Sequence, residues 1–162
     1  MRQNHAASER DSMNIVASYL PQDRRQALAT DLDLPSRAVG AALLADISRF
    51  TALTEALSQQ LGPRRGIEVL TAKINTVYDV LTAHVDAYRG IVIGFAGDAI
   101  TCWFSDSTDA GISGASPRAV ACALALQADM RAFQSILLPD GGSIGLGLKV
   151  AVASGQARRF DG

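Results

Sequence analysis

Two aspartates, Asp46 and Asp98, combine a residue type that binds cations with a position beside an apolar run. Asp46 follows the apolar run 38–45, and the segment 47–51 after it leads into a helical pattern. Free backbone N–H groups at a helix N-terminus attract an anion. A carboxylate beside an anion site is repulsive unless a cation lies between them, and Mg²⁺ is held in this way by one or two carboxylates and phosphate oxygens.

Asp98 follows Gly97 in a turn-rich stretch between the apolar runs 91–95 and 100–104. The pattern predicts a β-hairpin with Asp98 at its tip, where Gly97 permits a tight turn and the close approach of a ligand. If this hairpin lies beside the first strand, the two carboxylates approach each other. Two carboxylates and a triphosphate can hold two metal ions about 3.5–4 Å apart, which suits attack by an alkoxide on a phosphoryl group.

Each aspartate also has a purely structural interpretation. An aspartate between a strand and a helix commonly caps the helix, which would explain Asp46. An aspartate after glycine in a hairpin is commonly a turn residue, which would explain Asp98. Periodicity alone does not separate these interpretations from a metal site.

The elements that would position the aspartates follow from the apolar pattern. The run 38–45 predicts a strand buried on both faces, and a helix capped by Ser48 or Thr51 follows and extends to Gly62. Pro63 begins a long amphipathic helix that ends near Gly90. Its predicted buried stripe consists of Ile67, Leu70, Ile74, Val77, Leu81 and Val85.

The hairpin is followed by a polar loop over 105–116 and a helix over 117–137, for which Ser116 is the expected cap. The expected inner face of that helix consists of Val120, Leu124 and Ala128, and a last strand is expected over 144–153. This order predicts a ferredoxin-like α/β sandwich over 37–162 that is cut short at its C-terminus, after an N-terminal helical and linker segment over 1–36.

Composition restricts the function classes. The chain has 162 residues, 48% of them hydrophobic, and a net charge of -1, which argues against a nucleic-acid-binding surface. Its first residues lack the apolar run of a signal peptide, and no apolar stretch reaches the length needed to span a bilayer, so no direct membrane insertion is expected. Cys102 and Cys122 are expected to be reduced core residues of a cytoplasmic protein. His84 is expected to be structural or solvent-facing, and Asp106 to be only solvated.

The sequence around both aspartates resembles a known enzyme family. Segment 45–51, ADISRFT, resembles the A-D-I-S-G-F-T signature that opens class III adenylate and guanylate cyclase domains. Segment 94–99, GFAGDA, resembles the K-F-x-G-D-A hairpin of the same family. Segments 120–127 and 148–155 are similar to its third helix and following strand. Within the family the chain is similar to soluble bacterial domains that precede a large ATPase and repeat region.

The resemblance implies a ferredoxin-like nucleotide cyclase fold with its active site between two domains, supplied by a homodimer or a second cyclase-like domain. The substrate would be a nucleoside triphosphate, with ATP expected, and the product a 3′,5′-cyclic nucleotide and pyrophosphate. The cofactor would be Mg²⁺ or Mn²⁺, with Ca²⁺ as a further candidate. Asp46 and Asp98 would be the catalytic metal ligands. The implied nucleotide-binding positions are Ile47, which also binds metal through its backbone, Ser48, Arg49, Phe50, Thr51 and Gly97.

The chain departs from the family pattern at three points. Arg49 replaces the signature glycine, and Gly94 replaces the lysine that recognises the base. The family's later asparagine and arginine lie beyond residue 162, so this chain alone is expected to be inactive. Two alternatives remain: a cyclase-homology module that binds nucleotide or a partner domain without chemistry, and a phosphoacceptor receiver domain, against which the hairpin argues.

Overall fold

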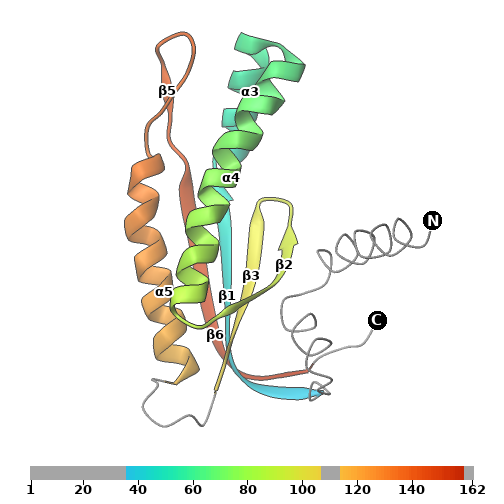
Figure 1. Cartoon of the computed structure of the whole chain (residues 1–162), viewed down its shortest axis with the longest axis vertical. Coiled ribbons are helices and arrows are strands. Elements are labelled where there is room, and N and C mark those ends of the chain that lie inside the picture. The colour runs from blue at the N-terminus through green and yellow to red at the C-terminus, as the bar shows by residue number, and fades with distance from the viewer. Residues whose placement is uncertain (1–35, 107–113, 159–162) are drawn as a thin grey trace, which may run out of the picture.

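The computed structural model describes residues 36–106 and 114–158. One antiparallel sheet, with strand order β2-β3-β1-β6, carries α4 and α5 on one face (Figure 1). The predicted N-terminal segment and most of the predicted polar loop lie outside the described residues. The elements are β1 (Arg37–Ser48), α3 (Phe50–Leu61), α4 (Pro63–Ala87), β2 (Ile91–Ala96), β3 (Ala99–Ser105), α5 (Ala115–Asp129), the 3₁₀ helix η1 (Met130–Phe133), β4 (Ile136–Leu137), β5 (Ser143–Ile144) and β6 (Gly147–Arg158).

The central strand β1 is buried on one face only, so the prediction of two buried faces is wrong. Its inward residues Leu43 and Ile47 are at most 1% exposed, whereas Leu44 between them is 50% exposed. Among the described elements, helices cover one side of the antiparallel sheet and none covers the other side. We call the uncovered side the open face; in the three strands that flank the site it includes Leu44, Asp46, Thr101, Lys149 and Ala151.

The long helix α4 buries five of the six predicted stripe residues, and Ile67 is the exception at 57% exposure. The predicted inner face of α5 is wrong, because Val120 and Leu124 are 47% and 67% exposed. Its buried residues are Ala115, Ala119, Cys122 and Leu126. These are mostly small side chains, which let the helix axis lie close to the sheet.

Both ends of α5 also differ from the prediction. The helix begins at Ala115 after the cap residue Gly114, and it ends at Asp129 before η1. The predicted last strand divides, because Ser143–Ile144 pairs with Ile136–Leu137 in a separate hairpin while β6 starts at Gly147. Between these two strands the chain passes close to Gln134, and Gly145 permits this approach because a Cβ there would collide with the backbone oxygen of Gln134.

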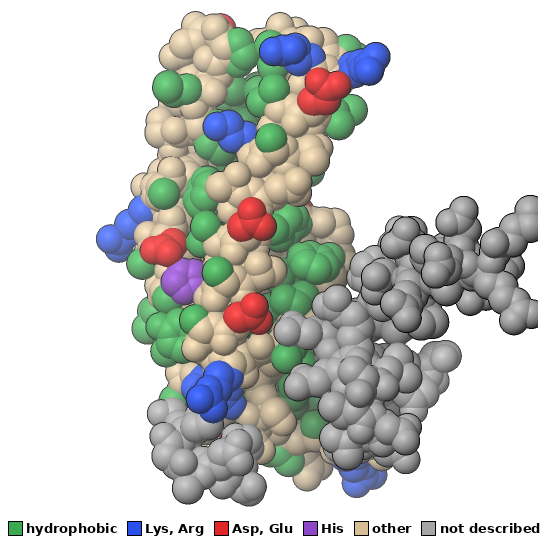
Figure 2. Space-filling model, viewed as in Figure 1, with side chains coloured by type: hydrophobic (Ala, Val, Ile, Leu, Met, Phe, Trp, Pro, Cys, Tyr) green, Lys and Arg blue, Asp and Glu red, His purple; other side chains and the backbone are tan. Residues whose placement is uncertain are grey.

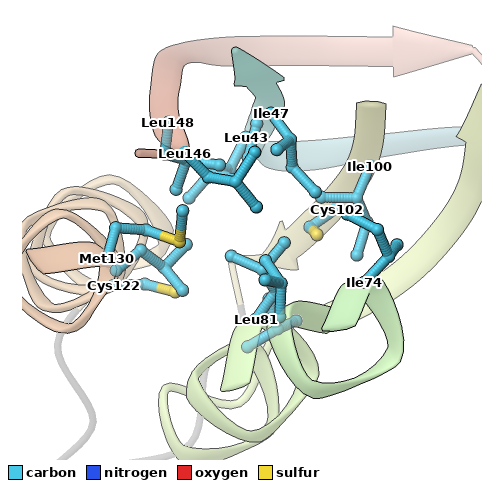
Figure 3. Close-up of a cluster of buried hydrophobic side chains, with 14 of the residues drawn as sticks. Leu43, Ile47, Ile74, Leu81, Ile100, Cys102, Cys122, Met130, Leu146 and Leu148 are labelled. Carbon is cyan, nitrogen blue, oxygen red and sulfur yellow. The ribbon is translucent and has the colours of Figure 1, made fainter. Parts of the chain in front are cut away.

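The core lies between the sheet and the helices, where strand residues such as Leu43 meet Leu81 of α4 (Figure 3). Both cysteines are buried in it as free thiols, which confirms their expected place. Burial raises the pKa of Cys102 to about 12 and that of Cys122 to about 11. Among the described residues, no helix has the length and apolar character needed to cross a membrane.

Candidate active site

Asp46 lies within β1 and not after it, because the strand continues to Ser48. It is paired across the sheet with Ala99 of β3 and with Lys149 of β6. Since its neighbours Ala45 and Ile47 point into the core, the alternation of the strand directs Asp46 to the open face. The carboxylate is 46% exposed, and its Oδ2 lies 4.0 Å from Nζ of Lys149.

Asp98 lies at the tip of the β2–β3 hairpin, as predicted, next to Gly97 with φ +62°. The backbone N–H of Ile47 donates a hydrogen bond of 3.2 Å to the carbonyl oxygen of Asp98. This bond joins the tip to the end of β1, and Asp46 is paired with Ala99, the residue after Asp98. The hairpin therefore lies beside the first strand and brings the two aspartates to adjacent positions of the backbone.

Tyr78 of α4 supports the hairpin tip, a function that the sequence analysis missed. Its hydroxyl donates a hydrogen bond of 3.3 Å to the carbonyl of Gly97, and its ring meets Phe95 edge-on at 5.3 Å. Burial, followed by the negative charge of Asp98, raises the pKa of Tyr78. The available signal was a tyrosine next to Val77 in the apolar stripe, but the stripe alone does not say which strand it faces.

The turn between β1 and α3 is formed by Arg49, which occupies the N-cap position of α3 with a backbone φ of +67° and ψ of 15°. No side chain caps this helix, so the prediction of Ser48 or Thr51 as the cap is wrong. A left-handed backbone is one that glycine adopts readily and other residues rarely do. The guanidinium of Arg49 has no hydrogen bond or ion pair with any described residue.

A hollow of about 450 Å³ lies beside this turn and is lined by Arg49, Gln134, Gly145, Leu146 and Gly147. Gly147 is paired with Ser48, and a Cβ at Gly147 would lie 2.6 Å from the Ser48 hydroxyl oxygen. The hollow thus lies on the β6 side of the turn. Neither aspartate lines it.

The donor set suits a cation that brings ligands of its own. Within the described ranges no three His, Cys, Asp or Glu side chains gather into a metal site. Asp46, Asp98 and the carbonyl of Ile47 are oxygen donors on adjacent segments. Mg²⁺ fits such a set, because it usually keeps several waters and takes one or two carboxylates together with substrate phosphates.

Gly94 occupies the position at which the family's base-recognising lysine is expected. It pairs with Thr101 after a bulge in β2, and a Cβ built on it would meet nothing within 4 Å. The space around position 94 would therefore accept a longer side chain, and packing does not require glycine there.

Two residues outside the site have partners that the sequence did not indicate. Asp106 accepts a hydrogen bond of 2.7 Å from the backbone N–H of Ala115, so the expectation that it is only solvated is wrong. Nε2 of His84 lies 2.7 Å from Oδ2 of Asp129 and links the ends of α4 and α5.

On the face in Figure 2, Lys and Arg side chains are scattered among acidic ones.

Solved structures that resemble this chain are adenylyl and guanylyl cyclases. A bacterial light-regulated adenylyl cyclase aligns with a TM-score of 0.70 at 17% identity, over 94% of this chain and 42% of its own. The adenylyl cyclase CyaB from P. aeruginosa gives 0.55 at 23% identity, over 74% and 57%. The guanylyl cyclase Cya2 gives 0.55 at 21% identity, over 74% and 55%. No protein-family model and no curated protein matches the chain.

At identities below 25%, these structural similarities establish the fold alone. The chain has the mixed α+β fold of class III cyclase domains, with an antiparallel sheet packed against helices, which confirms the predicted fold class. The chain spans 42% to 57% of the length of these three cyclases.

Proposed function

We propose that this chain supplies the metal-binding half of a nucleotide cyclase site. The observation that carries the proposal is the junction of β1 with the β2–β3 hairpin, where Asp46 and Asp98 occupy adjacent backbone positions. The fold supports the same reading, because it is that of adenylyl and guanylyl cyclases. The structural interpretations of the two aspartates do not explain why their backbone positions are adjacent.

The proposed reaction converts a nucleoside triphosphate, with ATP expected, into its 3′,5′-cyclic monophosphate. The ribose 3′-oxygen forms a bond to the α-phosphorus, the bond from that phosphorus to the oxygen bridging to the β-phosphate breaks, and pyrophosphate leaves with the electron pair. The 3′-hydroxyl proton passes to solvent or phosphate. Mg²⁺ or Mn²⁺, or Ca²⁺, held by Asp46 and Asp98 would stabilise the developing charge.

Each residue of the site would have a distinct function. Asp46 and Asp98 would hold the cations, and the carbonyl of Ile47 would add one ligand. Backbone N–H groups at the start of α3, from Phe50 onward, would bind the phosphates, because the first turn of a helix leaves its N–H groups free. Tyr78 keeps the hairpin tip in place through Gly97.

Base recognition would come from a second cyclase-like domain or a second copy of this chain with further segments. Position 94 is a glycine and cannot contact a base through a side chain. Because the chain spans about half of the solved cyclases, we expect the 162-residue chain alone to give little product.

Arg49 and Gly94 favour a second candidate function, a non-catalytic module that binds nucleotide or pairs with a catalytic domain. Both residues replace family positions that contact the substrate. This candidate predicts nucleotide binding without product.

The test is formation of cyclic AMP and cyclic GMP from ATP and GTP with Mn²⁺, by the whole protein that contains this chain. Asp46→Ala and Asp98→Ala should each lower the rate by at least about a hundredfold, the usual scale for loss of a charge-stabilising group. Asp86→Ala, which removes an exposed aspartate from the far end of α4, is the matched control. Equal rates for wild type and Asp98→Ala would refute the site, and nucleotide binding without product would favour the module.

A further inference from the structure

The hollow beside the turn into α3 has no part in the proposed reaction. It encloses about 450 Å³, a size typical of small-molecule sites. Its lining comes from three segments that are distant in sequence: Arg49 after β1, Gln134 after η1, and the run 145–147 that leads into β6. Leu146, at 2% exposure, belongs to the core (Figure 3) and forms the apolar part of the lining. The tertiary fold thus builds a hollow whose lining contains one cation and no acidic residue.

The two residues of the lining that have polar side chains are both unpaired. Among the described residues, neither the guanidinium of Arg49 nor the side-chain amide of Gln134 has a hydrogen-bond or ion-pair partner. Arg49 also keeps a backbone φ of +67°, which is costly for a residue other than glycine. A strained arginine without a partner in its own domain is explained if its guanidinium binds a ligand.

We propose that this hollow binds a phosphate ion, held by the guanidinium of Arg49, at a site separate from the two aspartates. A guanidinium presents its N–H groups as a planar fork that matches the oxygens of a phosphate, and such charge-assisted hydrogen bonds are strong. The amide of Gln134 offers two further donors. No acidic side chain lines the hollow, so nothing in the lining repels an anion.

The sheet topology separates the hollow from the proposed metal site. In the strand order β2-β3-β1-β6, the hairpin that carries Asp98 lies on one side of β1, and Gly147 of the hollow lies on the other. Neighbouring strands are about 4.8 Å apart, so these two positions are about 10 Å apart across the sheet. Neither Asp46 nor Asp98 lines the hollow. Phosphate binding here therefore does not depend on the proposed function.

The test is a titration of the 162-residue chain with inorganic phosphate, followed by ¹⁵N NMR at constant ionic strength with chloride as the balancing anion. The backbone amide signals of Gly145 and Gly147 should shift with phosphate and reach saturation. Arg49→Gln should weaken binding at least about tenfold, because it removes the charged donor and keeps the chain at this position otherwise alike. Gln134→Glu adds a negative charge to the lining and should weaken binding roughly threefold or more.

Arg89→Gln is the matched control, because Arg89 is the other described arginine with a left-handed backbone, at φ +56°, and it does not line the hollow. This variant should bind phosphate as wild type does. Equal affinity in wild type and Arg49→Gln, or shifts that do not saturate, would refute the site. If 3′-deoxy-ATP with Mg²⁺ displaces the phosphate, the hollow holds a phosphate of the nucleotide, and the proposal of a separate site is wrong.

Discussion

Arg49 holds a left-handed backbone conformation at the turn that leads into α3, and Arg49→Gly should make the domain more stable. The value of φ is +67°, a region that costs an ordinary residue about 1–2 kcal/mol and glycine almost nothing. Glycine also gains freedom in the unfolded chain, which returns about 0.4–1 kcal/mol. The free energy of unfolding should therefore rise by roughly 0.5–1 kcal/mol, and the melting temperature by roughly 2–3 °C.

The assay is urea unfolding followed by circular dichroism, with the midpoint and slope compared between variants. Arg49→Ala removes the guanidinium but keeps the strained φ, so it should not be more stable than wild type. Arg89→Gly offers an internal check, because Arg89 has φ +56° at the other end of the long helix. A lower midpoint for Arg49→Gly would refute the reasoning, since it would show that the guanidinium stabilises the folded chain more than its backbone strain destabilises it.

Two further predictions concern the core and the hairpin. The pKa values of Cys102 and Cys122 are raised in the folded protein to about 12 and about 11, so the stability they contribute is complete below pH 9 and is lost as pH rises through these values. The free energy of unfolding of wild type should therefore fall between about pH 9 and pH 12, and it should fall less in the double variant Cys102→Ala/Cys122→Ala. The same dependence of the unfolding free energy on pH in both proteins would contradict this prediction. Tyr78→Phe removes the hydrogen bond to Gly97 and should lower the free energy of unfolding by about 0.5–1.5 kcal/mol, measured with urea; an unchanged midpoint would show that the bond does not support the tip.

The hairpin and its neighbour strand could be predicted because their signals are local. Gly97 and Asp98 between two apolar β-prone runs specify a hairpin, and Pro63 fixes the start of α4. The prediction that Asp46 and Asp98 are adjacent holds only if the hairpin lies beside the first strand. The structure meets that condition through the Ile47–Asp98 backbone bond.

The remaining features depend on contacts between segments distant in sequence. In α5 apolar residues occupy nearly every side of the helix, so periodicity could not show that Cys122 faces inward and Leu124 outward. The run 38–45 is continuously apolar, yet the described helices pack against one side of β1 and leave Leu44 on the other side half exposed. Lys149 was one residue in an apolar strand, and its position opposite Asp46 follows from the β1–β6 register, which no local pattern gives.

Anomalous diffraction tests most directly whether Asp46 and Asp98 hold the cation of a nucleotide complex. Crystals of the protein grown with Mn²⁺ and 3′-deoxy-ATP would be measured at the manganese absorption edge. We expect anomalous peaks within bonding distance of both carboxylates and of the nucleotide phosphates. A fully bound nucleotide with manganese elsewhere, or with the two carboxylates turned to opposite sides of the sheet, would contradict it.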